Sequence, residues 1–415
     1  MAETIQTPSL LHNRDYMFLW SGQVVSVLGS RLSEIVFPLL AWDLTGSPIA
    51  AGILVACYKV PLVLFSLPAG ALIDRWDRKR AMMWCDTLRC LAFATIPVST
   101  VLGALTIWQL FIVALIEGTL SVFFNVAQVA ALPRVVQKEQ LPEAGAQNQA
   151  TTAIAEFAGP GLGTTIYQFL GQTVPFVFDS ISYALSVVSL FFIKTPFQEE
   201  RAPTAKRHLL AEIREGLAWL WGHSLIRFVA FLTGGVNLVF TASEIFIIAL
   251  ALHVGANKAE IGFVFSIGSI GAIVGAAVAG RVQKRFAYRQ VTVGSVWIMA
   301  LLFPLYAIAP NVIVLGAVTA LAYFTAPVFT VTQLAYRLPL IPDQMQGRVN
   351  STYRLIIFGF QPIGALLGGY LVSQLGPATA VLAFSAWLAL LAVVVAFNPE
   401  IRGTQSGARV APEAL

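Results

Sequence analysis

Six ionisable side chains interrupt long apolar runs of this chain, where a charge is unfavourable. A charged side chain at the centre of a lipid bilayer costs about 2.5–3.5 kcal/mol on insertion scales, so it faces a bundle interior or a water-filled cavity. Carboxylates in such places bind and release protons, because burial disfavours their charged form. Each of the six is a functional candidate: Arg31, Glu34, Lys59, Glu117, Glu156 and Glu244.

Three of the carboxylates are candidates for proton coupling. Glu117 and Glu156 are the first choice, since each stands well inside its apolar run. Glu34 follows Arg31 by three residues, which places the two on one helix face, and a standing ion pair is the simpler interpretation of that spacing. Proton coupling by Glu34 is the alternative.

The other charges bear on the substrate. Lys59 either neutralises one of the acids or binds an anionic substrate, whereas Glu244 suits substrate or outer-gate contact as well as proton coupling. The four acids and two bases have a net charge of −2 if all ionise, which favours cationic or neutral amphiphiles. An anionic siderophore is the alternative substrate.

Polar side chains also recur at helical spacing beside these charges. At about 100° per residue, positions three or four apart share a helix face, so each group predicts a polar stripe. Stripes on several helices predict one central substrate cavity, although any single stripe is also explained by hydrogen bonds between helices. The expected cavity residues are Gln23, Arg31, Lys59, Asn125, Gln128, Asn237, Glu244, Tyr323 and Gln361.

The elements that carry these side chains are predicted to be membrane-spanning helices. Hydrophobic residues make up 57% of the chain and charged residues 11%, which excludes a water-soluble domain of this size. A spanning helix needs about 20 mostly apolar residues. Twelve such runs begin near residues 16, 49, 82, 108, 147, 173, 227, 259, 289, 311, 349 and 376.

Basic residues predict the orientation of these spans. With the amino terminus in the cytoplasm, Lys258 alone lies outside, Arg31 and Lys59 lie within spans, and the other basic residues lie on the cytoplasmic side. Both termini are then cytoplasmic in a multi-pass protein of the cell membrane, plasma or inner. No cleavable signal peptide is expected, because the first apolar run is too long. This asymmetry explains the net charge of +5, so no nucleic-acid partner is expected.

Metal, cofactor and enzymatic sites find no support in the sequence. Cys57, Cys85 and Cys90 lie within or beside spans without an outer partner, and the four histidines share no ligand spacing with them. No phosphate-binding G-x-x-x-x-G-K-[ST] loop occurs, which excludes nucleotide hydrolysis by this chain. No nucleophile, base and orienting group stand together in the spans, so we expect neither an enzyme nor a cofactor.

The longest polar interruption divides the spans into two sets of six. We expect a cytoplasmic amino-terminal segment, two six-helix bundles joined by a cytoplasmic linker, and a cytoplasmic tail. Within the linker, Leu209, Ile213 and Leu217 recur at helical spacing and predict an amphipathic helix at the membrane surface, with a plain linker as the alternative. The predicted boundaries are 1–15, 16–194, 195–226, 227–397 and 398–415.

The two halves repeat a pattern of glycine and proline. The fifth span contains Gly159, Pro160 and Gly163, and the eleventh contains Pro362 and Gly364. Glycines four residues apart let a neighbouring backbone approach closely, and proline adds a kink or a stiff point. We interpret these residues as helix-packing positions in a duplicated bundle.

A charged loop between the second and third spans is the most specific motif of the chain. It reads GALIDRWDRKR over residues 70–80, and a shorter copy, GRVQKR, follows the eighth span with Gly280 in place of the aspartate. The loop resembles the signature G-x-x-x-D-R-x-x-R-K/R of the major facilitator superfamily. Its motif residues are Gly70, Asp74, Arg75, Arg78, Lys79 and Arg80.

Most of the remaining chain resembles one bacterial branch of that superfamily, which contains macrolide and enterobactin exporters. The resemblance is carried by NRDYMFLWSGQVVSVLGSRL at 13–32, LPRVVQKEQLPEA at 132–144, GP at 159–160 and GRV at 347–349. It implies an all-α membrane protein with twelve transmembrane helices in two pseudo-symmetric six-helix bundles. The third, sixth, ninth and twelfth spans would be peripheral, and we expect no charge near their middles.

The resemblance also implies a gate. Loop 70–80 would be a latch that holds the halves together on the cytoplasmic side in the outward-open state, with Gly70 where two helices meet. Alternatively, its arginines serve only as topology markers. Asp86 and Arg89, at the start of the third span, are interpreted as structural, with support of the latch as the alternative.

These features together predict a secondary active transporter. The leading hypothesis is a proton-coupled efflux antiporter that exports amphiphilic small molecules, drug-, macrolide- or siderophore-like, by alternating access. A proton-coupled importer of a small metabolite is the closest alternative, followed by a non-transporting polytopic membrane protein. The expected partners are the substrate, protons and the lipid bilayer, and we expect a monomer.

Overall fold

A computed structural model describes residues 10–198 and 209–404, and these residues form helices and no strands. Residues 1–9, 199–208 and 405–415, which belong to the predicted amino-terminal segment, linker and tail, lie outside the described residues, as do the side chains of Leu209 and Ile213. The first eight helices are α1 (Arg14–Glu34), α2 (Val36–Thr45), α3 (Pro48–Phe65), α4 (Pro68–Ile73), α5 (Arg78–Val101), α6 (Ile107–Val135), α7 (Leu141–Leu170) and α8 (Val174–Phe192).

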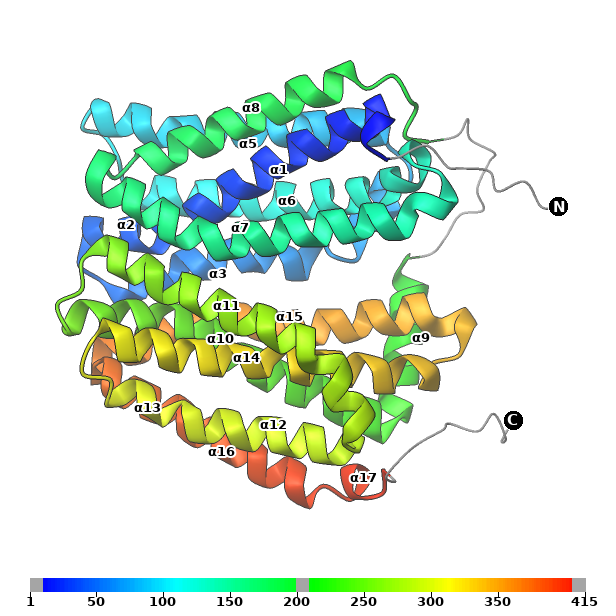
Figure 1. Ribbon diagram of the computed structural model, residues 1–415, viewed down its shortest axis with the longest axis vertical. Helices are drawn as coiled ribbons and strands as arrows, with labels where there is room; N and C mark the ends of the chain where they lie inside the picture. Colours follow the sequence, from blue (N-terminus) through cyan, green and yellow to red (C-terminus); the bar gives the residue numbers. More distant parts are fainter. Residues whose placement is uncertain (1–9, 199–208, 405–415) are drawn as a thin grey trace.

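The second half of the chain repeats this plan after one connecting helix. Its helices are α9 (Leu209–Gly222), α10 (Ser224–His253), α11 (Lys258–Arg285), α12 (Tyr288–Leu302), α13 (Pro304–Ala307), α14 (Val312–Arg337), α15 (Gln346–Leu375), α16 (Pro377–Phe397) and α17 (Pro399–Arg402). Helices α1–α8 form the first bundle and α10–α17 the second, stacked one above the other in Figure 1.

The twelve predicted span starts agree with twelve long helices. The largest deviation is six residues, at the fifth span, because α7 begins at Leu141 with a polar first turn that hydropathy does not detect. Within the described ranges, ten segments are long and apolar enough to cross a membrane. Helices α5 and α7 have 24 and 30 residues and are also long enough, but they are more polar.

The first span is broken into α1 and α2 at Ile35. Pro38 lacks an amide hydrogen and its ring crowds the carbonyl four residues earlier, that of Glu34, which explains an interruption at this point. The break places Arg31 and Glu34 at the carboxyl end of α1, midway through the 32-residue span.

The two ends of the molecule differ in charge. Helix α1 begins and α16 ends at the same end, on the right of Figure 1, which also holds the charged loop before α5; we call it the basic end. Helix α2 ends and α11 begins at the opposite end, which we call the Lys258 end. Helix α9 lies at the basic end and packs on α15, where Glu215 pairs with Arg348.

Closely packed glycines hold corresponding helices together in the two bundles. An added Cβ at Gly159 would lie 2.5 Å from Cβ of Arg31, and one at Gly163 would lie 2.8 Å from the carbonyl carbon of Leu32, so α7 packs directly on α1. In the second bundle, an added Cβ at Gly364 would lie 2.9 Å from the carbonyl carbon of Leu238 on α10. The fifth span thus packs on the first as the eleventh packs on the seventh.

The bundles meet through α3 with α15 and through α7 with α11. The close contacts lie near the Lys258 end: an added Cβ at Gly52 would be 2.6 Å from the carbonyl oxygen of Ala365, and the Gly161 amide donates to Ser266 Oγ at 3.0 Å. These small residues let the bundles approach at that end.

Candidate functional site

A chain of alternating charges crosses the interior of the first bundle. Glu156 on α7 accepts a hydrogen bond from Arg31 at 2.9 Å, and Arg31 also binds Glu34 at 2.5 Å. Glu34 in turn faces Lys59 on α3, with 3.6 Å between its carboxylate and Nζ. The predicted Arg31–Glu34 ion pair is present, and each of the two acids has at least one cationic partner.

Pro160 affects this chain through the backbone. A proline has no amide hydrogen to donate to the carbonyl four residues earlier, which here belongs to Glu156. That carbonyl oxygen accepts instead from Ser269 Oγ on α11, at 2.8 Å. The residue that binds Arg31 is therefore also tied to the second bundle.

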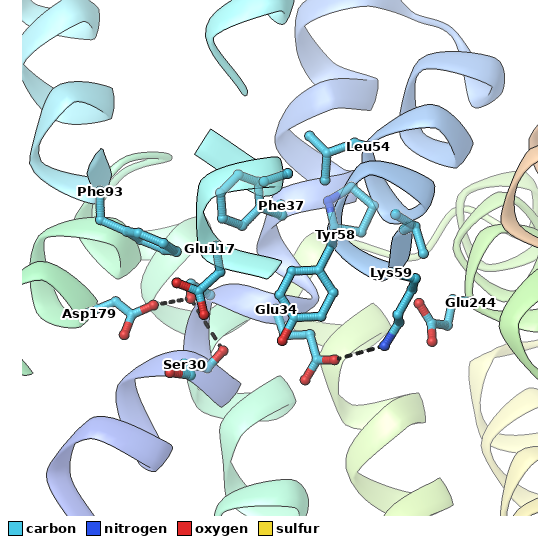
Figure 2. Close-up of a pocket in the computed structure, with 14 residues that line it drawn as sticks. Ser30, Glu34, Phe37, Leu54, Tyr58, Lys59, Phe93, Glu117, Asp179 and Glu244 are labelled. Carbon is cyan, nitrogen blue, oxygen red and sulfur yellow. Dashed lines mark hydrogen bonds and ion pairs between the residues drawn. The ribbon is translucent and has the colours of Figure 1, made fainter. Parts of the chain in front are cut away.

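Glu244 faces the chain of charges from the second bundle. Figure 2 shows its carboxylate on α10 opposite the Lys59 ammonium. The same view shows carboxylates in a row, from Asp179 through Glu117 and Glu34 to Glu244. The row spans both bundles.

Glu34, Lys59, Glu117, Asp179 and Glu244 line one cavity. Its walls combine carboxylates with aromatic and aliphatic side chains, as ligand pockets commonly do. Figure 2 shows the labelled lining residues Ser30, Glu34, Phe37, Leu54, Tyr58, Lys59, Phe93, Glu117, Asp179 and Glu244.

A second, more polar cavity shares Ser30, Glu34 and Tyr58 with the first. It is also lined by Gln23 and Asn125, and Gln23 lies nearer the start of α1 than Glu34 does. The two cavities together thus extend from the row of carboxylates toward the basic end.

Some predicted cavity residues lie elsewhere. Gln128 donates a hydrogen bond to Gln23, so it supports the wall of the polar cavity. Tyr323 packs on Phe240 with ring centroids 5.7 Å apart. Asn237 and Gln361 are half-buried on α10 and α15, and neither lines the two cavities described.

A buried group of one base and three acids lies between α5, α6 and α8, and we call it the acid cluster: Asp86, Arg89, Glu117 and Asp179. The guanidinium of Arg89 donates hydrogen bonds to both carboxylate oxygens of Glu117, with 2.8 Å for the Nε contact. It also donates to Asp86 at 3.3 Å. Glu117 is therefore held in a bidentate ion pair.

Arg89 and Asp179 correct the expectation that the third and sixth spans carry no charge near their middles. Helix α5 begins at Arg78, so Arg89 is its twelfth residue rather than part of its first turns, and it is 5% exposed. Asp179 on α8 is fully buried and accepts hydrogen bonds from Ser33 and Ser182. Ser182 and Ser186 follow it at helical spacing, and this polar stripe was the signal in the sequence.

Tyr183 connects the acid cluster to the cavity. Its hydroxyl donates to Glu117 at 3.2 Å and lies 2.8 Å from Ser30 Oγ. Its ring lies beneath the guanidinium of Arg89, with 4.1 Å from Cζ to the ring centroid. Ser30 precedes Arg31 on α1. The acid cluster therefore lies next to the chain of charges that contains Arg31, and α1 contacts both.

The charged loop before α5 ties helices of the first bundle together. Asp77 caps α5 by accepting from the Arg80 amide at 2.9 Å, and Arg78 binds Asp74 at 3.3 Å. Arg78 also donates to the carbonyl of Ala130 at 3.0 Å, and Lys79 donates to that of Ile193 at 2.7 Å. These contacts join α5 to α6 and to the end of α8.

Gly70 is not at a close helix contact in this conformation. An added Cβ there would meet no atom of the described residues within 4 Å, contrary to the expectation from the sequence, because α4 is a short separate helix that leaves this face open. Gly280 in the second copy is equally uncrowded.

Polar contacts bridge the two bundles at the Lys258 end. Lys258 at the start of α11 pairs with Asp43 on α2, and its amide donates to Gln168 Oε1 at 3.2 Å. Tyr167 on α7 donates to the same Asp43 at 2.6 Å. Polar contacts therefore join α2, α7 and α11 at this end.

Known proteins resemble the chain over nearly its whole length. It is 26% identical to the multidrug efflux pump Tap of Mycolicibacterium fortuitum, covering 90% of this chain and 93% of the relative. It is 22% identical to macrolide efflux protein A of Streptococcus pyogenes, with 92% and 96% covered. The enterobactin exporter EntS of Shigella boydii is also 22% identical, with 89% and 88% covered.

The fold and the family follow from two further comparisons. The crystal structure of a mutant of the nucleoside transporter NupG superposes with a TM-score of 0.76 at 15% identity, covering 91% of this chain and 98% of that chain. The profile of a family described as transmembrane secretion effector matches residues 6–413. The chain therefore belongs to the transmembrane secretion effector family of the major facilitator superfamily of transporters.

Proposed function

We propose that the protein is a proton-coupled efflux antiporter that exports amphiphilic small molecules by alternating access. One observation supports this proposal: a single cavity, built mainly by the first bundle and reached by Glu244 of the second, combines apolar walls with Lys59 and the carboxylates Glu34, Glu117, Asp179 and Glu244. Carboxylates in one cavity with the substrate let protons and substrate compete for the same place. The relatives named as efflux pumps and exporters support export.

The orientation of this cavity follows from charge. Basic loops prefer the cytoplasmic side, so the basic end faces the cytoplasm and the Lys258 end faces outward. The protein then lies in the cell membrane with both termini in the cytoplasm. With the Lys258 end bridged by Lys258 and Asp43, we assign this conformation to the inward-facing state of the cycle.

Substrate contact is assigned to residues that line this cavity. Phe37, Leu54 and Tyr58 offer an apolar surface, and Glu244 offers a carboxylate from the second bundle. Glu34 and Glu156 already have cationic partners at 3.6 Å or less, so they hold Arg31 and Lys59 in place. A cationic or neutral amphiphile fits this charge distribution.

Loop 70–80 is assigned to gating. In the inward-facing state, Arg78 and Lys79 are bound to carbonyls of the first bundle. When the basic end closes, the loop must contact the second bundle. Some of the contacts of Arg78 and Lys79 with the first bundle are then lost. The loop then acts as a latch whose charges change partners during the cycle, and the protein works as a monomer.

Inside-out membrane vesicles test the direction and the energy source together. Ethidium, a fluorescent amphiphilic cation, should accumulate in vesicles that contain the protein when their lumen is acidified, and nigericin should abolish the accumulation. Vesicles with the Asp343→Asn variant, which changes an exposed carboxylate outside the cavities, should behave as the wild type does. Proton-driven loss of ethidium from the lumen would instead support import, and gradient-independent behaviour across a panel of amphiphiles would reject proton coupling.

A further inference from the structure

The acid cluster contains more buried carboxylates than cations. Asp86 and Asp179 are fully buried, and Glu117 is 3% exposed. Arg89 is the one base that binds these acids among the residues that the structure describes. If all three acids were ionised, the cluster would enclose two uncompensated negative charges.

Such an excess is unstable away from water. An isolated buried charge is unfavourable by several kcal/mol or more, and a buried carboxyl group with no cation takes up a proton instead. By contrast, the side chain of Glu156 is 45% exposed and pairs with Arg31. The acid cluster therefore holds at least one proton.

The hydrogen bonds distinguish the three acids. Glu117 receives two donors from Arg89, and Asp86 receives one from the same guanidinium, which leaves Asp86 Oδ2 buried without a hydrogen-bond partner in the described part of the chain. Among the described residues, Asp179 has no cation within ion-pair distance and accepts hydrogen bonds from the hydroxyls of Ser33 and Ser182. Hydroxyls compensate a carboxylate less than a guanidinium does.

Ser33 can serve both protonation states of Asp179. When the carboxyl group is ionised, the Ser33 hydroxyl donates to it. When the carboxyl group is protonated, it can donate to Ser33 Oγ, because that hydroxyl also lies 3.4 Å from the carbonyl of Gly29 and 3.3 Å from that of Ser30 and can turn toward either. The site thus keeps its hydrogen bonds while a proton is bound or released.

The surroundings of Asp179 contain no further cation that could replace the proton, among the residues that the structure describes. Helix α5 presents Asp86 and Arg89, and α6 presents Glu117. Helix α2 presents the ring of Phe37, and Tyr183 follows on α8 itself. On α1, the residues nearest to Asp179 are Gly29 and Ser33, while the charges of α1 are paired in the chain through Arg31, Glu34 and Lys59.

We propose that Asp179 is the group that binds the exchanged proton, an assignment that rests on the proposed antiport. Asp179 lines the same cavity as Glu244, so a substrate there meets both groups. When a cationic substrate enters, the O–H bond of Asp179 breaks, the proton passes to water in the cavity, and the carboxylate accepts from Ser33 and Ser182. Release of the substrate outside reverses the step.

Infrared spectroscopy of the purified full-length protein tests the proton site without a substrate. The wild type at neutral pH should show the C=O band of a protonated, buried carboxyl group. Asp179→Asn should lose that band, whereas Asp86→Asn and the exposed-site control Asp343→Asn should keep it. Absence of the band in the wild type, or its loss in Asp86→Asn with retention in Asp179→Asn, would overturn the assignment.

Transport in the inside-out vesicles tests the coupling. Asp179→Asn should lower proton-driven ethidium accumulation by about tenfold while downhill ethidium exchange continues, which also shows that the variant is folded. Full coupling in Asp179→Asn, with the wild type coupled, would reject Asp179 and leave the antiport standing. Failure of wild-type coupling with the infrared band present would reject the antiport and leave a buried proton site.

Discussion

Buried ionisable side chains are concentrated in the first bundle. Between α5 and α6, Arg89 grips Glu117 and Asp86. Between the corresponding helices of the second bundle, α12 and α14, the polar contact is neutral: Gln333 donates to Thr292 at 3.0 Å and accepts from Tyr288 at 2.6 Å. The second bundle keeps the helix arrangement and replaces charge by amide and hydroxyl groups.

The interior of the second bundle is instead filled with aromatic rings. Phe246 packs on Phe303, Tyr306 and Phe384 with ring centroids between 5.6 and 6.2 Å apart. Its charged groups in the interior include Glu244, at the cavity, and Arg337, whose guanidinium stacks on Tyr353 at 3.5 Å. A pseudo-symmetric fold can thus distribute its polar groups unevenly: the first bundle contains most of the buried charged side chains that the structure describes, and the second contributes one described carboxylate, Glu244, to the cavity.

The two bundles should differ most in the free energy of unfolding that is lost when one partner is removed from the polar contact at Arg89 or from that at Gln333. Arg89→Met leaves buried carboxylates without their cation and should lower the free energy of unfolding by about 3–5 kcal/mol. Gln333→Leu breaks neutral hydrogen bonds and should lower it by about 1 kcal/mol. Denaturant unfolding of the two purified variants measures the difference, and equal losses would contradict the division between the bundles.

Replacing a tightly packed glycine by alanine should destabilise both bundles to a similar extent. An added Cβ at Gly163 or Gly364 would lie within 3 Å of a carbonyl carbon on the neighbouring helix, so Gly163→Ala and Gly364→Ala should each cost about 1–3 kcal/mol. Gly280→Ala is the matched control, since nothing lies within 4 Å and alanine favours a helix by about 1 kcal/mol. Thermal unfolding ranks the three variants by stability. A large loss of stability in Gly163→Ala without one in Gly364→Ala would show that the two bundles do not pack alike.

The acid of the second bundle should affect substrate binding rather than stability. Glu244→Gln removes the one cavity carboxylate that this bundle contributes, and we expect about tenfold weaker binding of ethidium, which corresponds to about 1.4 kcal/mol. Binding of chloramphenicol, an uncharged amphiphile, should not change. Titration of the purified variant with both compounds is the measurement, and equal weakening of the two would show that Glu244 acts through shape rather than charge.

The bridge at the Lys258 end should have the smallest effect. Lys258→Met removes a partly exposed ion pair worth about 0.2–1 kcal/mol, so the population open at that end should rise by at most about fivefold. Distances between spin labels placed at Thr45 and Asn257 report this population, with Lys138→Met as the control at the basic end. An unchanged distance distribution in Lys258→Met would show that the Lys258–Asp43 pair does not affect gating.

Much of the helical framework could be predicted from the sequence, because a spanning helix depends on local composition. The first span shows the limit: its length follows from the apolar run, but the break at Ile35, four residues after Arg31, is not predicted by the sequence pattern. The start of α7 was placed six residues late because its first turns are polar.

The site was predictable where its partners are near in the sequence. Arg31 and Glu34 lie three residues apart, and their pairing followed from helix geometry. The partners Arg31 and Glu156, or Arg89 and Glu117, are brought together only by packing of different helices. Asp179 is the sixth residue of α8, and its burial against α1 and α5 depends on the packing of helices far apart in the sequence.

Proton release on substrate binding tests the central claim most directly. Ethidium is added to the purified protein in a weakly buffered solution that contains a pH indicator. We expect the wild type to release protons as ethidium saturates the site, and Asp179→Asn to release none while still binding ethidium. Binding of ethidium to the wild type without any proton release would contradict a shared cavity for proton and substrate.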